Sequence, residues 1–257
     1  METPEAIRET GKSPPYLYLK LREFIADILF PRACISCGKP DIFFCESCLQ
    51  AVPRRRVFDC PICRTVRTPD GETCLRCRKR SALDGVFAPA IFHEQAVVAE
   101  AIHALKYEFV PDLALPLGTL LAERARDTDL SIPDIIIPVP LHPWRMRYRG
   151  FNQSALIARS FSESFIPGFP IPVREDILIR KRFTLPQAKS RNAKERKENL
   201  RDAFSLSLGN PDLKRAVKGK VVWLVDDVAT TGTTLEECAR TLKKSGAKKI
   251  FGVVVAQ

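Results

Sequence analysis

The chain has 257 residues, of which 45% are hydrophobic and 28% charged, and its formal net charge is +11. This length and composition allow one or two domains with a sizeable core, and no apolar run approaches the roughly 18–20 residues that a membrane span needs. The N-terminus carries Glu2, Glu5 and Glu9 instead of a basic stretch followed by an apolar one. We therefore see no secretory signal and expect a cytoplasmic protein.

The positive charge is concentrated in two stretches of the chain. Residues 140–201 contain 14 Lys and Arg against 5 Asp and Glu, and residues 32–80 contain 11 against 5. Clustered charge of this kind attracts polyanions, so phosphate-rich small molecules and nucleic acid are both candidate ligands. A merely solubilising basic surface is the alternative interpretation.

The first 31 residues contain two predicted segments. Residues 1–15 are polar, include Pro14 and Pro15, and are expected to form a disordered tail. Residues 16–31 are expected to form a short amphipathic helix that Pro31 ends. Its apolar face consists of Leu17, Leu21, Phe24, Ile25 and Ile28. We expect this helix to pack on the following domain rather than to anchor a membrane.

Residues 32–80 are rich in cysteine and are predicted to form a double zinc ribbon. Eight of the nine cysteines form four CxxC pairs, namely Cys34 and Cys37, Cys45 and Cys48, Cys60 and Cys63, and Cys74 and Cys77. One CxxC turn presents two thiolates to one ion, and two turns complete a tetrahedral site with Zn–S distances of roughly 2.3 Å. The odd cysteine count and the missing export signal argue against disulfides. Eight ligands therefore predict two Zn²⁺ ions.

The predicted zinc sites are structural, because four cysteine ligands leave no position open for a reacting water. Sequential pairing of the CxxC motifs is the simplest arrangement, and a cross-braced arrangement is the alternative. The ribbon also carries Arg54, Arg55 and Arg56, and a second basic run at residues 76–80. These side chains could dock nucleic acid or a protein partner.

Residues 84–257 alternate between strand and helix patterns. Strands are expected at 86–92, 134–140, 177–179, 204–208, 220–225 and 250–255, and helices at 95–107, 112–127, 151–165 and 233–245. This alternation predicts an α/β fold around a mainly parallel sheet. Such sheets bind ligands at the carboxyl ends of their strands.

The segment 221–234 is the strongest functional signal. Its apolar strand delivers two adjacent carboxylates, which can bind vicinal ribose hydroxyls directly or through Mg²⁺. Backbone N–H groups at the start of the following helix suit a 5′-phosphate, and a glycine lets the backbone approach it closely. The candidate binding residues are Asp226, Asp227, Val228, Ala229, Thr230, Thr231, Gly232, Thr233 and Thr234. The alternative, an ordinary N-capped helix, would need only one threonine.

This segment resembles the phosphoribosyl pyrophosphate signature of type I phosphoribosyltransferases, and the wider chain resembles the ComF family, in which a double zinc ribbon precedes such a domain. The resemblance covers nearly everything from residue 21 to residue 256. Its motifs include Phe30-Pro31, Cys60-Pro61-x-Cys63, Ile102-x-x-Leu105-Lys106-Tyr107, Pro138-Val139-Pro140, Arg149-Gly150-Phe151-Asn152-Gln153, Gln187, Arg196-x-x-Asn199-Leu200 and Ala203-Phe204. It implies a type I phosphoribosyltransferase fold for residues 84–257.

The resemblance also implies further site residues. Residues 138–153 correspond to a pyrophosphate-binding loop, in which Arg145, Arg147 and Arg149 suit bidentate phosphate contacts, and Lys106 could add a cation. Residues 181–201 correspond to a mobile flap that excludes water when it closes. The candidate flap contacts are Thr184, Gln187, Arg191, Arg196 and Asn199. The candidate catalytic residues are Asp226, Asp227, Arg149 and Lys106.

The implied reaction displaces pyrophosphate from the anomeric carbon of the ribose by a nitrogen nucleophile, with Mg²⁺ and arginines taking up charge on the leaving group. One position departs from the family pattern, because purine-salvage members carry an aspartate where this chain has Thr230. Classical purine salvage is therefore disfavoured. His93, His103 and His142 are candidate replacement bases by residue type alone.

Three functional hypotheses follow. The protein is an active phosphoribosyltransferase with an unidentified acceptor, a non-catalytic factor that senses phosphoribosyl pyrophosphate or handles single-stranded DNA, or a scaffold that docks a motor such as a competence helicase. ComF relatives are associated with DNA uptake in natural competence. Stacking residues are sparse in the ribbon, where Phe43, Phe44 and Phe58 are the aromatic residues between the first and last CxxC pairs. The oligomeric state stays open.

Overall fold

The structure is a computed structural model that describes residues 32–93, 96–181, 202–207 and 212–257. The expected tail at 1–15, the expected helix at 16–31 and the flap candidates Gln187 and Arg196 lie outside these residues, as do Thr184, Arg191 and Asn199. Within the described residues, no helix combines the length and the apolar character that crossing a membrane requires.

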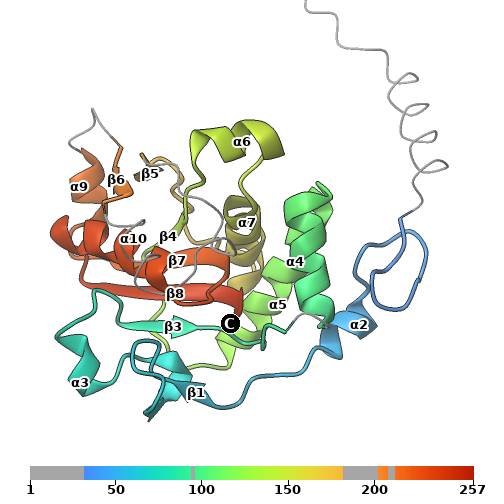
Figure 1. Ribbon diagram of the computed structural model, residues 1–257, viewed down its shortest axis with the longest axis horizontal. Helices are drawn as coiled ribbons and strands as arrows, with labels where there is room; N and C mark the ends of the chain where they lie inside the picture. The colour runs from blue at the N-terminus through green and yellow to red at the C-terminus, as the bar shows by residue number, and fades with distance from the viewer. Residues whose placement is uncertain (1–31, 94–95, 182–201, 208–211) are drawn as a thin grey trace, which may run out of the picture.

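A sheet of four parallel strands forms the centre of the protein (Figure 1). Its order is β3-β8-β7-β4, with β3 at Gly85–Phe87, β8 at Lys249–Ala256, β7 at Val221–Val228 and β4 at Ile135–Pro138. Long runs of Val, Ile and Leu form β7 and β8, as expected for strands that are covered on both faces. The predicted α/β fold with a mainly parallel sheet is confirmed.

Helices cover both faces of this sheet, and each face has its own apolar core. Trp223 and Val225 of β7 face one core, and Val222 and Leu224 face the other, because successive side chains of a strand alternate. The first core contains α4 (Val97–Tyr107), α5 (Ala114–Arg126) and α7 (Gln153–Phe165). The second contains α10 (Thr233–Lys244), α9 (Asp212–Val217), β5 (Leu178–Arg180) and β6 (Phe204–Leu206).

Four expected strands differ from the structure. The strands expected at 177–179 and 204–208 pair only with each other, as the antiparallel ribbon β5–β6 outside the main sheet. Strand β3 ends at Phe87, two residues before Pro89, whose missing N–H cannot extend a ladder. Strand β7 is longer than expected and includes Asp226 and Asp227. Its pairing with β8 continues to Val228, which lies opposite Ala256.

The expected pyrophosphate loop at 138–153 contains a helix that periodicity did not reveal, α6 (Pro143–Arg149). Pro143 occupies the first turn, where its missing N–H costs nothing, and the ring of His142 accepts a hydrogen bond from the Trp144 N–H. Gly150 ends the helix in the left-handed conformation at φ 81°. None of the residues of α6 is buried, so the sequence shows no apolar stripe.

The cysteine-rich region packs on the domain in two separate halves (Figure 1). The half with α2 (Glu46–Gln50) contributes Phe44, Leu49 and Val52 to the same core as α4 and α5. The other half lies beside β3, to which Glu72 forms an isolated bridge at Gly85. It contains β1 (Phe58–Asp59), β2 (Arg67–Thr68), the 3₁₀ helix Pro69–Gly71 and α3 (Leu75–Arg78).

Candidate functional site

Two adjacent carboxylates lie at the carboxyl end of β7, between the ends of β4 and β8. The hydroxyl of Ser154, in the first turn of α7, donates to Oδ1 of Asp226 at 2.8 Å. Nζ of Lys106, in the last turn of α4, lies 2.7 Å from Oδ2 of Asp227. Asp227 is only 3% exposed. The fold therefore brings the predicted residues Asp226, Asp227 and Lys106 into one group.

The ionisation of Asp226 is shifted in this group. Burial, and after it the charge of Asp227, raises the pKa of Asp226 to about 7, against the opposing effects of the Ser154 hydrogen bond and the Lys106 charge. Carboxylate and hydroxyl oxygens are the ligands that Mg²⁺ prefers, and it binds proteins through one or two carboxylates. The donor set fits a Mg²⁺ ion.

Two arginines, Arg149 and Arg180, interact with the charges of the carboxylates, and Arg145 interacts with both arginines. The half-buried guanidinium of Arg149 lies over the ring of Tyr107, with 5.7 Å from Cζ to the ring centroid, and donates to the Gln153 side chain. Burial lowers its pKa, which the Asp227 charge opposes. Arg180, which sequence reasoning missed, lies over the ring of Phe204.

The charges of these arginines act on one another. Burial lowers the pKa of Arg180, the Arg145 charge lowers it further, and the Asp226 charge opposes both. The Arg145 charge also lowers the pKa of Arg149. Arg149 and Arg180 therefore contribute positive charge at the acidic pair, and Arg145 contributes positive charge beside both arginines. Arg147 is exposed on α6, and no described contact brings it to these arginines.

The loop after β7 leads into an uncapped helix. Gly232 stands at the N-cap of α10 with φ 71°, and no described side chain caps this helix. A Cβ atom at Gly232 would meet nothing within 4 Å, so the space in front of the helix is open. The Thr231 and Thr233 hydroxyl oxygens lie 2.9 Å apart. The alternative of a threonine-capped helix is therefore not what the structure shows, and the helix start fits an anion such as a phosphate.

The cysteines form two four-thiol clusters within the described residues. One joins Cys34, Cys37, Cys45 and Cys48, and the other joins Cys60, Cys63, Cys74 and Cys77, with all sulfurs of a cluster within 4.8 Å of one another. The Cys37–Cys45 and Cys63–Cys74 sulfur distances are 3.6 and 4.0 Å. A tetrahedral zinc site has an S–S edge of about 3.8 Å. The clusters correspond to sequential pairing, and each could hold zinc.

The surroundings favour a thiolate at Cys45 and Cys63, whereas the pKa of Cys48 is raised to about 11 and burial raises that of Cys77 to about 12. The Ser47 hydroxyl, 3.2 Å from the sulfur of Cys45, lowers the pKa of that thiol to about 6. Thr65 has the same effect on Cys63, whose pKa is also lowered to about 6. Metal ligation requires the deprotonated thiol. None of the nine cysteines forms a disulfide.

The three histidines are not placed as bases for the acidic pair in any described contact. His142 caps α6, and burial lowers its pKa, as do the charges of Arg180 and Arg145. Nδ1 of His103 lies 3.4 Å from a Glu108 carboxylate oxygen at the exposed end of α4. His93 is exposed, and its carbonyl accepts the Ala96 N–H.

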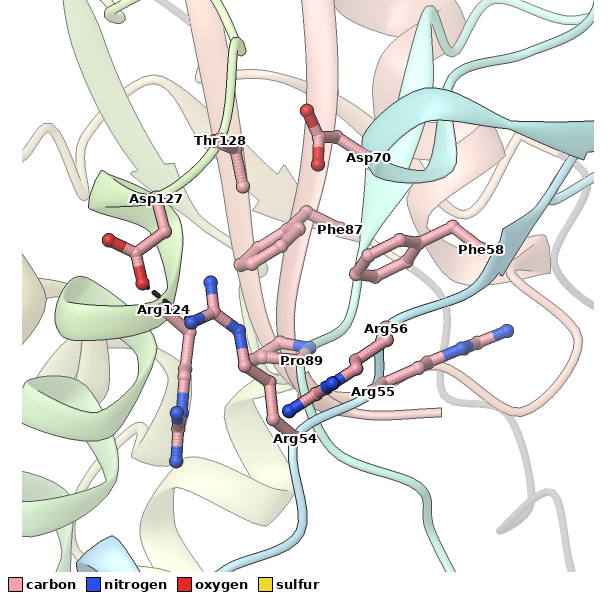
Figure 2. Close-up of a pocket in the computed structure, with 10 residues that line it drawn as sticks. All are labelled: Arg54, Arg55, Arg56, Phe58, Asp70, Phe87, Pro89, Arg124, Asp127 and Thr128. Atoms are coloured by element: carbon pink, nitrogen blue, oxygen red, sulfur yellow. Dashed lines mark ion pairs between the residues drawn. The ribbon is translucent and has the colours of Figure 1, made fainter.

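A second, basic site lies at the edge of the sheet (Figure 2). This pocket has a volume of about 340 Å³ and is lined by Arg54, Arg55, Arg56, Phe58, Asp70, Phe87, Pro89, Arg124, Asp127 and Thr128. Arg54 pairs with Asp127 at 2.7 Å, and Arg55 lies over the Phe58 ring. Arg56 is exposed and has no described partner. The pocket therefore offers cations beside an aromatic ring.

Comparison with known proteins assigns the cysteine-rich region and the domain that carries the acidic pair to one family. Residues 161–257 match the phosphoribosyl transferase domain. Competence protein F of Haemophilus influenzae is 37% identical over 138 residues, which cover 54% of this chain and 56% of that protein. DNA utilization protein YhgH of Salmonella typhimurium is 31% identical over 217 residues, which cover 80% of this chain and 86% of that protein.

Among solved structures, the glutamine phosphoribosylpyrophosphate amidotransferase from B. subtilis is 20% identical, with a TM-score of 0.35 over 56% of this chain and 26% of that one. The two curated relatives, the phosphoribosyl transferase domain and the two four-cysteine clusters all agree with one assignment. The chain belongs to the ComF family, and it combines a phosphoribosyltransferase fold with a cysteine-rich N-terminal region.

Proposed function

We propose that the protein binds phosphoribosyl pyrophosphate together with Mg²⁺ at the carboxyl end of β7. The observation that carries this proposal is the acidic pair Asp226–Asp227 directly before an uncapped helix start at Gly232. The carboxylates suit ribose hydroxyls and a divalent cation, and the helix start suits the 5′-phosphate. The ribose hydroxyls and the 5′-phosphate of one ligand therefore each find suitable groups within residues 226–234.

The chain's own groups would divide the ligand between them. Asp226 and Asp227 hold the ribose hydroxyls and the cation, and the backbone of residues 230–234 holds the 5′-phosphate. Arg145, Arg149 and Arg180 face the pyrophosphate, where a guanidinium can make two parallel hydrogen bonds. Mg²⁺, when bound, neutralises negative charge that develops on the pyrophosphate. Arg147, Gln187 and Arg196 remain predicted contacts.

If the bound ligand reacts, the protein would transfer its phosphoribosyl group to a nitrogen acceptor. These arginines and Lys106 support this step by electrostatic stabilisation of the departing pyrophosphate. Thr230 offers no carboxylate to an acceptor nitrogen, and the described histidines have other partners. We therefore favour an acceptor whose nitrogen reacts without a protein base, and classical purine salvage stays disfavoured.

Calorimetry with phosphoribosyl pyrophosphate, with and without Mg²⁺, tests the binding site. The double variant Asp226→Asn/Asp227→Asn should lose binding, and unaltered affinity would contradict the site. Asp134→Asn is a matched control because Asp134 accepts a hydrogen bond from the Val221 N–H at the opposite end of β7. Its affinity should equal that of the wild type.

Turnover requires a separate measurement. The protein, Mg²⁺ and phosphoribosyl pyrophosphate are incubated with pools of nucleobases and amines, and pyrophosphate release is followed over time. Release that depends on one pool identifies a transferase and its acceptor class. Binding without release in every pool favours a protein that senses the ligand.

The second candidate function is the handling of single-stranded DNA, and the basic pocket in Figure 2 is the observation that favours it. The names of the relatives refer to competence and to DNA utilization. A groove with cations and aromatic rings suits the backbone and bases of a single strand. In this interpretation a competence helicase is a candidate partner.

Arg56 provides a clean test of the DNA proposal. Arg56→Ala should weaken binding of a labelled oligonucleotide and reduce its dependence on salt, because one phosphate contact is lost. Arg67→Ala removes an equal charge from an exposed position of β2 and should change affinity little. Equal affinities for the wild type and both variants would exclude the pocket as the DNA site.

We also infer that both cysteine clusters hold structural Zn²⁺, with residues 32–80 as the double zinc ribbon and residues 84–257 as the phosphoribosyltransferase domain. The lowered pKa values of Cys45 and Cys63 support metal ligation. Nine cysteines without a disulfide fit a reducing compartment, so a cytoplasmic location remains our expectation.

A further inference from the structure

The two cysteine clusters contain the same turn with different residues. In the first cluster, the N–H of Gly38 donates to the carbonyl of Cys34 at 2.8 Å, and in the second, the N–H of Arg64 donates to the carbonyl of Cys60 at 2.9 Å. Each donor directly follows the second cysteine of a CxxC pair. Both residues are left-handed, with φ 74° at Gly38 and 56° at Arg64. The turn itself therefore needs no side chain.

An arginine in this turn is unfavourable for the backbone. Left-handed φ values bring the Cβ atom of an L-residue close to its own backbone, and glycine avoids this penalty. The first cluster uses glycine, yet the second keeps Arg64. A residue held in a disfavoured conformation commonly serves a function that the fold must stabilise elsewhere. We therefore expect this function to involve the side chain of Arg64.

The guanidinium of Arg64 reaches the loop that we propose as the phosphate site. Its Nη2 donates to the carbonyl oxygen of Thr230, 166 residues away in the chain. Thr230 lies two residues before Gly232, which is the N-cap residue of α10. Arg64 thus connects a cysteine cluster directly to the loop after β7.

A second connection holds the other end of the loop. The Ser81 hydroxyl donates to one carboxylate oxygen of Glu236 at 2.7 Å, and the N–H of Ala82 donates to the other at 3.0 Å. Glu236 lies in the first turn of α10. The second cysteine cluster and the residues just after it therefore hold the segment 230–236 at both ends.

We propose that Arg64 is a positioning residue of the 5′-phosphate site, supplied by the second cysteine cluster. By holding the Thr230 carbonyl, it orients the peptide groups of the loop so that their N–H groups face the phosphate. The inference rests on the proposed binding of phosphoribosyl pyrophosphate. It adds that the cysteine-rich region is part of the ligand site and does more than stabilise the fold.

The variant Arg64→Gly separates this role from a structural one. Glycine suits the left-handed turn, as Gly38 shows, so the variant should fold and keep its metal content. Affinity for ribose 5-phosphate should fall about tenfold, because binding must then order a loop that Arg64 no longer holds. Affinity for Mg²⁺-pyrophosphate, which contacts the other part of the site, should not change.

Arg67→Ala is the matched control, because it removes the same charge from an exposed position of the same region. It should leave both affinities at the wild-type values. Equal losses for Arg64→Gly and Arg67→Ala would show a general charge effect and would overturn the proposal. Unchanged ribose 5-phosphate affinity in Arg64→Gly would overturn it as well.

Hydrogen exchange without any ligand tests the same proposal independently of the proposed function. Amides in residues 229–235 should exchange faster in Arg64→Gly than in the wild type and in Arg67→Ala, and equal rates would overturn the positioning role. If the wild type binds neither ribose 5-phosphate nor phosphoribosyl pyrophosphate, the proposed function fails. The exchange result then still decides whether Arg64 orders this loop.

Discussion

Nζ of Lys106 and Oδ2 of Asp227 lie 2.7 Å apart, and this ion pair joins the end of α4 to the end of β7. Asp227 is almost fully buried, whereas Lys106 keeps about a fifth of its side chain exposed. Within the residues that the structure describes, Lys106 therefore provides the one positive charge in direct contact with the acidic pair. A bound metal cation would add to the positive charge that Lys106 already places beside Asp227.

The first prediction concerns Lys106→Met. Removing one partner of a largely buried ion pair leaves an uncompensated charge, so the free energy of unfolding should fall by about 3 kcal/mol in urea denaturation. Mg²⁺ should restore part of this loss, because a second cation can neutralise Asp227. The melting temperature of the variant should therefore rise more on addition of Mg²⁺ than that of the wild type.

Lys243→Met is the control for this prediction, since Nζ of Lys243 pairs with Asp84 at 2.9 Å away from the acidic pair. Mg²⁺ should have the same effect on its melting temperature as on that of the wild type. An equal Mg²⁺ response in all three proteins would contradict the cation site.

The second prediction concerns the hydrogen bond from Ser154 to Asp226. Ser154→Ala should lower the affinity for Mg²⁺ and phosphoribosyl pyrophosphate several-fold, because Asp226 loses a donor that orients its carboxylate. Ser160→Ala, on the same helix, removes a 2.8 Å hydrogen bond to the Leu115 carbonyl and should cost about 1 kcal/mol of stability. Calorimetry should show wild-type affinity for this control, and a similar loss in both variants would indicate a general effect of α7.

The third prediction concerns the contact between α5 and α7, which places Ser154 beside β7. A Cβ atom at Gly118 would lie 2.5 Å from Oγ of Ser160 and 2.8 Å from the N atom of Phe161. Gly118→Ala should therefore destabilise the protein by about 1–3 kcal/mol through overpacking, although alanine favours helix by about 1 kcal/mol. Leu115→Ala, at an exposed position of α5, should change urea denaturation by less than about 0.5 kcal/mol.

The fourth prediction concerns the metal content. Elemental analysis of the purified protein should find two zinc ions per chain, and Cys37→Ser and Cys63→Ser should each lose one, because each removes a ligand from a different cluster. Cys63→Ser should also weaken ribose 5-phosphate binding through Arg64. Cys37→Ser should mainly lower the stability of the core that the first cluster shares with α4 and α5. Loss of both ions in either variant would show that the clusters are interdependent.

The sequence predicted the parts of the fold and site that are local in the chain. The apolar run before Asp226 and the alternation of strands and helices are typical of a parallel α/β sheet, and the structure confirms that class. The CxxC spacing similarly predicted the eight thiols of the two clusters, with sequential pairing as the simpler of two arrangements. In these cases the residues that interact are close in sequence or follow a fixed period.

Contacts between distant residues could not be predicted in this way. Ser154 meets Asp226 across 72 residues, and Arg64 meets Thr230 across 166. A serine in the first turn of a helix is more commonly read as a cap, and an arginine after a CxxC pair as a solvated charge. Arg180 gave a weak signal, because a charged residue ends the apolar run of β5.

Helix α6 shows why periodicity fails for exposed elements. Its arginines alternate with Trp144, Met146 and Tyr148, and no residue of the helix is buried. Only the combination of Pro143 at the start and Gly150 at the end marked its boundaries. Trp144 and Tyr148 are exposed, and their rings stack at a centroid distance of 5.7 Å.

The order of strands in the sheet has a consequence for synthesis on the ribosome. Strand β8 lies between β3 and β7, although both precede it in the chain, so β3 has no neighbour in the sheet until residues 249–256 have emerged. The cysteine clusters, in contrast, have all their ligands within residues 34–77. A nascent chain can therefore assemble its cysteine clusters long before it completes its sheet. Insertion of β8 is the late event that brings β3, the second cluster and the loop after β7 together.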